Sequence, residues 1–107
     1  MHRSTWKAME RRIARFFGGE RNIGSGSLNR PDRSSSDSTH PTLYIECKSR
    51  KSFSLLTLWR DTLIKANKEK KIPLVAIHEL GKQGDFLLLK KEDLQAIAAL
   101  VSEGKFD

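Results

Sequence analysis

Glu46 and Lys48 are separated by one residue in a segment rich in β-strand formers, 42–48. Alternate side chains of a strand leave the same face, so the carboxylate and the ammonium lie about 7 Å apart along the chain. Such a pair can hold a divalent cation and place a positive charge beside a water molecule or a phosphate. An ordinary ion pair on one strand face uses the same two residue types, so the pair alone does not establish an active site.

Further charged residues surround this pair in the sequence. Asp37 precedes Glu46 by nine residues, close enough for the chain entering the strand to bring the two carboxylates together. Carboxylate oxygens, a backbone carbonyl and water form the ligand set that Mg²⁺ prefers. Arg50 and Lys51 follow closely and supply positive charge where a phosphate backbone would arrive. The pattern therefore predicts metal-assisted chemistry on a phosphate ester, with Lys48 stabilising the negative charge that develops in the transition state.

The elements that must position these residues alternate between helix and strand. Apolar residues recur at helical spacing over 6–17 and 55–66, whereas 74–78 is a continuous apolar run typical of a central strand covered on both faces. A Gly-containing turn then leads into the apolar stretch 86–89, which predicts a hairpin, and 92–102 closes the chain as a helix. The order predicts one small α/β domain over 1–107, with a mixed central sheet flanked by helices. Strand 42–48 is expected to run parallel to strand 74–78, and a short strand is expected near 21–23.

The segment 24–40 has a different composition, dominated by Gly, Ser, Asn, Arg, Asp and Pro, with Leu28 as its single apolar residue. Most connections in small domains contain about four to six residues, and longer ones tend to be functional or disordered. We expect a flexible loop that faces the substrate. A simple disordered linker is the alternative.

The charge balance points to a polyanionic partner. Twenty Lys and Arg residues against thirteen Asp and Glu give a net charge of +7, and nucleic acid is the first candidate. The polar face of the first helix carries Arg11, Arg12 and Arg15, which either contact phosphates or form an ordinary solvated face. No apolar run approaches the roughly 18 residues of a membrane span, and Cys47 is the only cysteine. The N-terminal segment has no continuous apolar stretch, so we expect no secretion signal. We expect a cytoplasmic protein without a membrane partner.

Several short motifs follow one another along the chain: Glu10-Arg11 in a helix, Gly24-Ser25-Gly26, Ser36 to His40, Leu43 to Lys51 and Pro73 to Glu79. This order, above all an Asp followed by Glu-x-Lys, resembles the PD-(D/E)XK nuclease superfamily. Within that superfamily it is most similar to the small Holliday junction resolvase-like endonucleases of archaea and phages. The resemblance covers roughly residues 10–89 and implies a restriction-endonuclease-like core.

The resemblance also implies roles for individual residues. Asp37 and Glu46, with the backbone carbonyl of Cys47, would bind Mg²⁺, for which Mn²⁺ is expected to substitute. Lys48 would position or activate the attacking water, and Glu10 would match an acidic residue on the first helix of the resolvase-like members. Candidate nucleic-acid contacts are Arg11, Arg12, Arg15, Ser25, Arg50 and Lys51.

The literal Pro-Asp pair of the sequence is Pro31-Asp32, whereas Ser36 precedes Asp37. Asp32 is therefore the alternative metal ligand, although the Asp-x-x-His-Pro context of Asp37, just before the strand, is closer to the phage members.

The function that follows is a metal-dependent endodeoxyribonuclease of DNA recombination, selective for branched DNA such as four-way junctions. In a phage it would act in the cytoplasm of the host. Symmetric cleavage of a junction needs two active sites, and a chain this small holds one, so a homodimer is expected. The alternatives are another repair or restriction-like nuclease, or a non-catalytic nucleic-acid-binding module. A pure binding module gains nothing from carboxylates that repel phosphate, unless a metal neutralises them.

Overall fold

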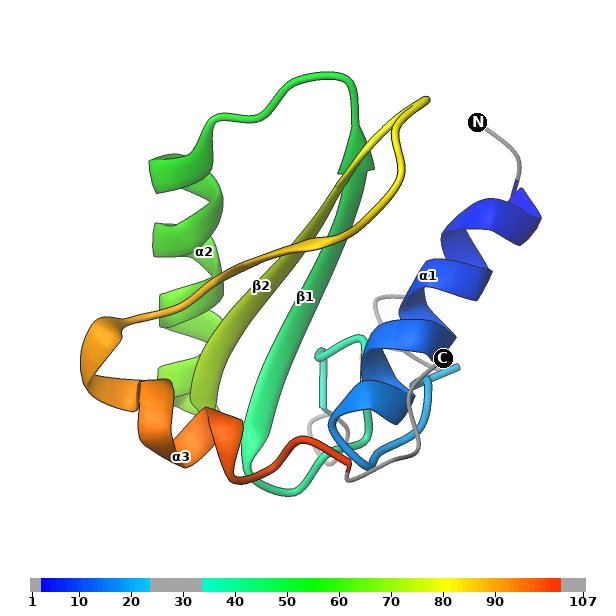
Figure 1. Cartoon of the computed structure of the whole chain (residues 1–107). Coiled ribbons are helices and arrows are strands. Elements are labelled where there is room, and N and C mark those ends of the chain that lie inside the picture. Colours follow the sequence, from blue (N-terminus) through cyan, green and yellow to red (C-terminus); the bar gives the residue numbers. More distant parts are fainter. Residues whose placement is uncertain (1–2, 24–33, 103–107) are drawn as a thin grey trace.

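The structure of the protein is a computed structural model, and it describes residues 3–23 and 34–102. The chain forms a small single α/β domain (Figure 1). Its elements in chain order are α1 (Arg3–Phe16), β1 (Leu43–Arg50), α2 (Leu55–Lys68), β2 (Ile72–Glu79), β3 (Phe86–Leu88), a 3₁₀ turn (Lys91–Asp93) and α3 (Leu94–Ala98). None of the helices in the described ranges is long and apolar enough to span a membrane.

The named strands form a three-stranded mixed sheet in the order β1-β2-β3. β1 and β2 are parallel, in a register that runs from Leu43 opposite Ile72 to Arg50 opposite Glu79. β2 and β3 are antiparallel, and the turn between them contains Gly84 with φ of +93°, a left-handed conformation that glycine adopts without strain. Both the predicted crossover and the predicted hairpin are confirmed.

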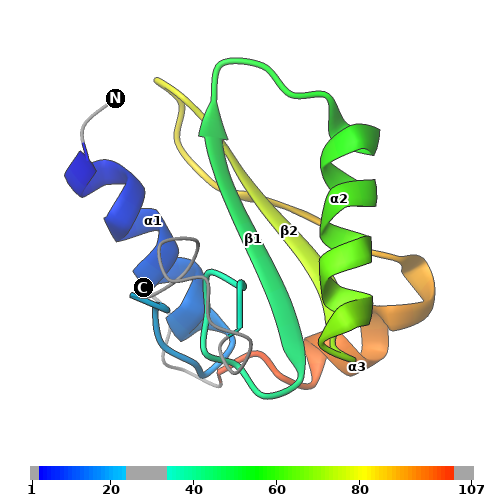
Figure 2. The same cartoon turned by 180° about the vertical axis from the view of Figure 1, so that it is seen from behind.

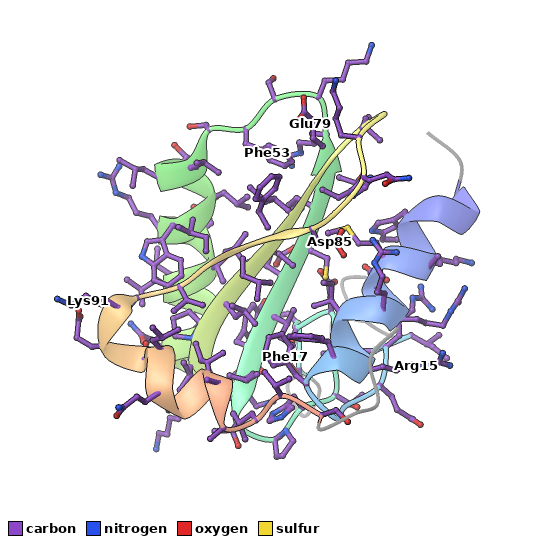
Figure 3. All side chains as sticks on the ribbon, in the orientation of Figure 1. Arg15, Phe17, Phe53, Glu79, Asp85 and Lys91 are labelled. Atoms are coloured by element: carbon purple, nitrogen blue, oxygen red, sulfur yellow. The ribbon has the colours of Figure 1, made fainter. Side chains whose placement is uncertain are left out.

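Helices cover both faces of the sheet (Figures 1 and 2). On one face α1 packs against β1, and the core there consists of Met9, Ile13, Phe17, Leu43, Ile45, Cys47, Leu74, Ala76 and Ile97. Figure 3 shows Phe17 directed from the end of α1 toward the sheet. On the other face α2 packs against β1 and β2 with Leu58, Thr62 and Ala66 buried. The central position predicted for 74–78 is confirmed for Leu74, Val75 and Ala76, which are fully buried.

The structure differs from the sequence-based expectation at Tyr44. Alternation along 42–48 predicts one buried and one open face, with Tyr44 on the open one. Tyr44 is instead fully buried, because the crossover helix α2 covers that face of the strand. Burial raises the pKa of its phenol well above the ordinary value, although a hydrogen bond with Ser35 acts in the opposite direction.

Residues 34–40 run along the free edge of β1 between that strand and α1 (Figure 2). Ser36, Asp37, Ser38 and His40 are buried there, so this part of the predicted loop is packed into the domain. The short strand expected near 21–23 is reduced to one antiparallel bridge between Arg21 and Ser38. Residues 24–33 of the predicted loop, which include Ser25 and Asp32, lie outside the described residues.

The closing helix is also shorter than the predicted range 92–102. A 3₁₀ turn opens it, and α3 itself ends at Ala98. Ile97 carries its contribution to the core, and Ser102 donates its backbone N–H to the carbonyl of Phe16 at 2.7 Å. The last described residues therefore close against the end of α1.

Candidate active site

Asp37 is held at the edge of β1 by two hydrogen bonds with that strand. Its backbone N–H donates to the carbonyl of Ile45 at 2.8 Å, and its Oδ2 accepts the N–H of Cys47 at 2.8 Å. The N–H and C=O of one strand residue point toward the same edge, so the carbonyl of Cys47 faces Asp37 as well. The carboxylate of Asp37 and a main-chain carbonyl thus lie together next to Glu46.

A serine-rich network fixes the segment that carries Asp37. The Oγ of Ser36 accepts the N–H of Ile45 at 2.9 Å and donates to its carbonyl at 3.2 Å. At the end of α2, Glu69 accepts hydrogen bonds from Ser34 and Ser35. Burial alone would raise the pKa of Glu69, but these hydrogen bonds outweigh it and hold the pKa below its ordinary value. The network stabilises one placement of Asp37 through neighbours on two elements.

Glu46 and Lys48 lie on the α2 face of β1, as their spacing predicts. The Nζ of Lys48 is 3.5 Å from the Oε2 of Glu46, and 13% of the Glu46 side chain is exposed. Burial raises the pKa of Glu46, and the negative charge of Asp37 adds to this effect. Lys48 and Lys65 act in the opposite direction, which places a second lysine near the carboxylate.

A pocket of about 160 Å³ opens between β1 and α2. It is lined by charged and hydroxyl side chains, with one leucine: Glu46, Lys48, Arg50, Ser54, Thr57, Leu58, Asp61, Thr62 and Lys65. Three of these side chains are cationic, so the pocket can receive a phosphate group beside the carboxylate of Glu46.

Glu10 approaches the site from α1. It is only 3% exposed, and its Oε1 accepts a hydrogen bond from the Nε of Arg21 at 2.7 Å. Burial raises the pKa of Glu10, and the charge of Asp37 adds to this, while Arg21 lowers it. Asp37 therefore acts electrostatically on both Glu10 and Glu46, and the three carboxylates form one acidic cluster.

A divalent cation suits this cluster. Burial and the charge of Asp37 disfavour the ionised forms of Glu10 and Glu46, and a cation would offset both effects. Mg²⁺ commonly uses one or two carboxylates and completes its shell with water, so Asp37, Glu46 and the carbonyl of Cys47 are a suitable partial set. Residues 3–23 and 34–102 contain no group of three His, Cys, Asp or Glu side chains that could hold a metal ion by themselves. A bound Mg²⁺ would therefore keep water ligands.

The side chain of Cys47 has no part in such a site. It is buried in the core beneath α1, and burial, followed by the nearby carboxylates, raises the pKa of the thiol well above its ordinary value. A protonated, buried thiol is a poor metal ligand. Cys47 can contribute only through its backbone carbonyl, as the sequence analysis expects.

The predicted nucleic-acid contacts separate into two groups. Arg11 and Arg15 are exposed on α1, with Arg15 directed away from the domain (Figure 3), and Arg50 and Lys51 are exposed where β1 ends. Arg12 is different, because its Nε and Nη2 donate to the two carboxylate oxygens of Asp85 at 2.7 and 2.8 Å.

The ion pair gives Arg12 a structural role. Figure 3 shows Asp85 directed toward α1 from the connection between β2 and β3. Arg12 thus joins two elements of the domain, and its charge is already neutralised by Asp85. Arg12 therefore contributes to the fold, and the arrangement favours Arg11 and Arg15 over Arg12 as nucleic-acid contacts; its place among the predicted contacts stays a prediction.

Two further residues of the site are Arg21, which no sequence pattern singles out, and Lys65, which the sequence offers only as part of a basic cluster at the end of the second helix. Arg21 binds Glu10 across eleven positions of the chain, in a segment with no periodic pattern. Lys65 lies seventeen residues after Lys48 and reaches the pocket only because α2 folds back over β1. Helical spacing places Lys65 on α2 but does not show which face of the sheet the helix covers.

Comparisons with protein-family models, with curated proteins and with solved structures give no match for this chain. The chemistry of the site is therefore the basis for its function. An acidic cluster with a carbonyl at its edge, beside a pocket lined by two lysines and an arginine, can bind a divalent cation and a phosphate next to each other.

Proposed function

We propose that the protein is a metal-dependent DNA endonuclease with a restriction-endonuclease-like core of the PD-(D/E)XK type. The observation that carries the proposal is the placement of Asp37, whose carboxylate accepts the N–H of Cys47 at 2.8 Å at the edge of the strand that bears Glu46 and Lys48. A sequence motif spread over twelve positions thereby becomes one local cluster. The same placement supports Asp37 as the metal ligand, while the alternative, Asp32, lies outside the described residues.

In this proposal Asp37, Glu46 and the carbonyl of Cys47 hold Mg²⁺ or Mn²⁺. The bound cation supplies positive charge at the phosphate and makes a water molecule more acidic. Lys48, 3.5 Å from Glu46, keeps a positive charge beside the attacking water and the phosphate oxygens. Lys65 offers a second positive charge from α2.

The part of Glu10 in the proposal is to extend the acidic cluster from α1. Its ion pair with Arg21 holds the carboxylate in place. The negative charge of Asp37 raises the pKa of Glu10, as expected for two carboxylates that lie close together. Glu10 thus raises the local negative charge that favours cation binding.

The substrate we propose is branched DNA, such as a four-way junction. The net charge of +7 and the exposed Arg11, Arg15, Arg50 and Lys51 support binding to a phosphate backbone. Cleavage of two strands at a junction requires two sites, so we propose that the chain acts as a homodimer.

The test is cleavage of end-labelled four-way junction, linear duplex and single-stranded DNA, each with Mg²⁺, Mn²⁺ or EDTA. The proposal predicts cleavage with either cation, fastest on the junction, and none in EDTA. Strong cleavage in EDTA would end the metal mechanism. Tight DNA binding with no cleavage under any condition would support a non-catalytic nucleic-acid-binding module instead.

A further inference from the structure

Trp6 is an exposed aromatic residue on α1 beside the acidic cluster. Its helical spacing from Met9 and Ile13 predicts a core position, yet 37% of Trp6 is exposed, whereas Met9 and Ile13 are 1% and 4% exposed. Met9 and Ile13, in the later turns of α1, are buried against the sheet, whereas Trp6, in the first turn, lies at the surface.

Arg21 joins Trp6 to the candidate site. Its guanidinium carbon lies 6.0 Å from the centre of the Trp6 ring, and its Nε donates to Glu10 at 2.7 Å. Trp6 and Glu10 are four residues apart on one helix, which corresponds to a rise of about 6 Å. The indole, the guanidinium and the carboxylate therefore form a continuous row that leads to Asp37.

The position of this row suits a DNA strand. The N-terminal end of α1 and the C-terminal end of β1 lie at the same end of the domain (Figures 1 and 2). Arg50 and Lys51, at the end of β1, offer charge to the phosphate backbone, while Trp6 offers a flat apolar surface. Charged residues beside an exposed aromatic ring are the combination that binds unpaired nucleotides.

We propose that Trp6, held by Arg21, is a stacking platform for an unpaired nucleobase on the α1 side of the strand edge that carries Asp37. The proposal rests on the nuclease function proposed above and adds a basis for substrate choice. A base within a continuous duplex is already stacked on both sides and cannot use the platform. An unpaired base at an open branch point or in a single strand has a free face, which every base offers regardless of sequence.

The two tryptophans of the chain permit a direct test. The variant Trp59→Phe leaves Trp6 as the single tryptophan, and Trp6→Phe leaves Trp59, on α2, as the matched control. Each is titrated with a four-way junction that carries unpaired bases at its branch point and with fully paired duplex. The titrations are made in Ca²⁺, whose looser coordination we expect to support binding without turnover. In Trp59→Phe, the junction should quench the tryptophan fluorescence several-fold more than the duplex does. In Trp6→Phe, neither DNA should change the fluorescence.

Affinity provides a second readout. Trp6→Leu keeps an apolar side chain but removes the ring, and it should weaken junction binding about tenfold while leaving duplex binding unchanged. Trp6→Phe should retain most of the affinity. Thermal denaturation of both variants shows whether the fold is intact.

Absence of quenching in Trp59→Phe, or an equal loss of junction and duplex affinity in Trp6→Leu, would overturn the platform. Cleavage without quenching would overturn the platform and leave the nuclease proposal intact. Quenching without cleavage would leave the platform and remove the nuclease proposal. Absence of any DNA binding would remove both.

Discussion

Three of the arginines on α1, Arg11, Arg12 and Arg15, should separate into one structural residue and two DNA contacts. Arg12 forms a two-point ion pair with Asp85, in which the side chains are 45% and 16% exposed. Because the pair is partly open to solvent, its loss in Arg12→Gln should cost about 1 kcal/mol of unfolding free energy. In a domain of this size that corresponds to a fall of about 5 °C in Tm. The exposed Arg11 and Arg15 should each change stability by less than about 0.5 kcal/mol.

DNA binding should show the reverse pattern. Each lost phosphate contact lowers the slope of log K against log salt by about 0.9, so the double variant Arg11→Gln/Arg15→Gln should flatten the slope by about 1.8. Arg12→Gln should leave the slope unchanged, because its charge is already paired with Asp85. The assay is fluorescence anisotropy of a labelled duplex between about 50 and 200 mM salt in Ca²⁺.

The matched control is Lys90→Gln/Lys91→Gln, which removes two exposed cations. Lys91 lies on the side of the domain away from α1 (Figure 3). It should alter neither Tm nor the slope by more than the error of measurement. The reasoning would be refuted by an unchanged slope in the Arg11 and Arg15 double variant, or by Arg12→Gln flattening the slope without lowering Tm.

Three further outcomes follow from the buried ionisable groups. Glu46→Gln should raise Tm at neutral pH and leave it unchanged below pH 4.5. The pKa of Glu46 is higher in the folded protein than in the unfolded chain, so ionising this carboxyl costs stability as the pH rises. Equal Tm values for the variant and the unmodified protein at neutral pH would contradict this. Glu69→Gln should lower stability at neutral pH by about 1 kcal/mol, since hydrogen bonds from Ser34 and Ser35 favour the charged form. That loss should shrink as the pH falls below 4.5 and through the lower folded-state pKa, and a loss independent of pH in thermal denaturation would refute it. Cys47 should react with a thiol reagent only on the time scale of unfolding, because its thiol is buried and has a raised pKa. Rapid modification of the native protein would contradict this and show that the core is open at Cys47.

Much of the fold is predictable because local patterns determine it. The continuous apolar run at 74–78 needs cover on both sides, which identifies β2 as the central strand. The turn around Gly81 and Gly84 predicts the hairpin for the same local reason. Tyr44 is not predictable in this way, since its burial depends on where α2 lies, and the strand pattern does not contain that information.

The candidate site shows the same division. The spacing of Glu46 and Lys48 places both on one strand face without further knowledge. The approach of Asp37 depends on Ser36, whose hydroxyl bonds both backbone groups of Ile45, and on Glu69 from α2. A segment of Gly, Ser and Asp predicts a loop, and only tertiary hydrogen bonds show which part of it becomes buried.

The proposed metal site is tested most directly by single-turnover cleavage of a four-way junction with Mg²⁺ by Asp37→Asn, compared with Asp32→Asn. Because a carboxylate that binds the cation contributes several kcal/mol to the transition state, Asp37→Asn should slow cleavage about a thousandfold or more, with junction binding equal or tighter. Asp32→Asn should cleave like the unmodified protein. Full activity in Asp37→Asn, with loss of activity in Asp32→Asn, would contradict the account and transfer the ligand role to Asp32.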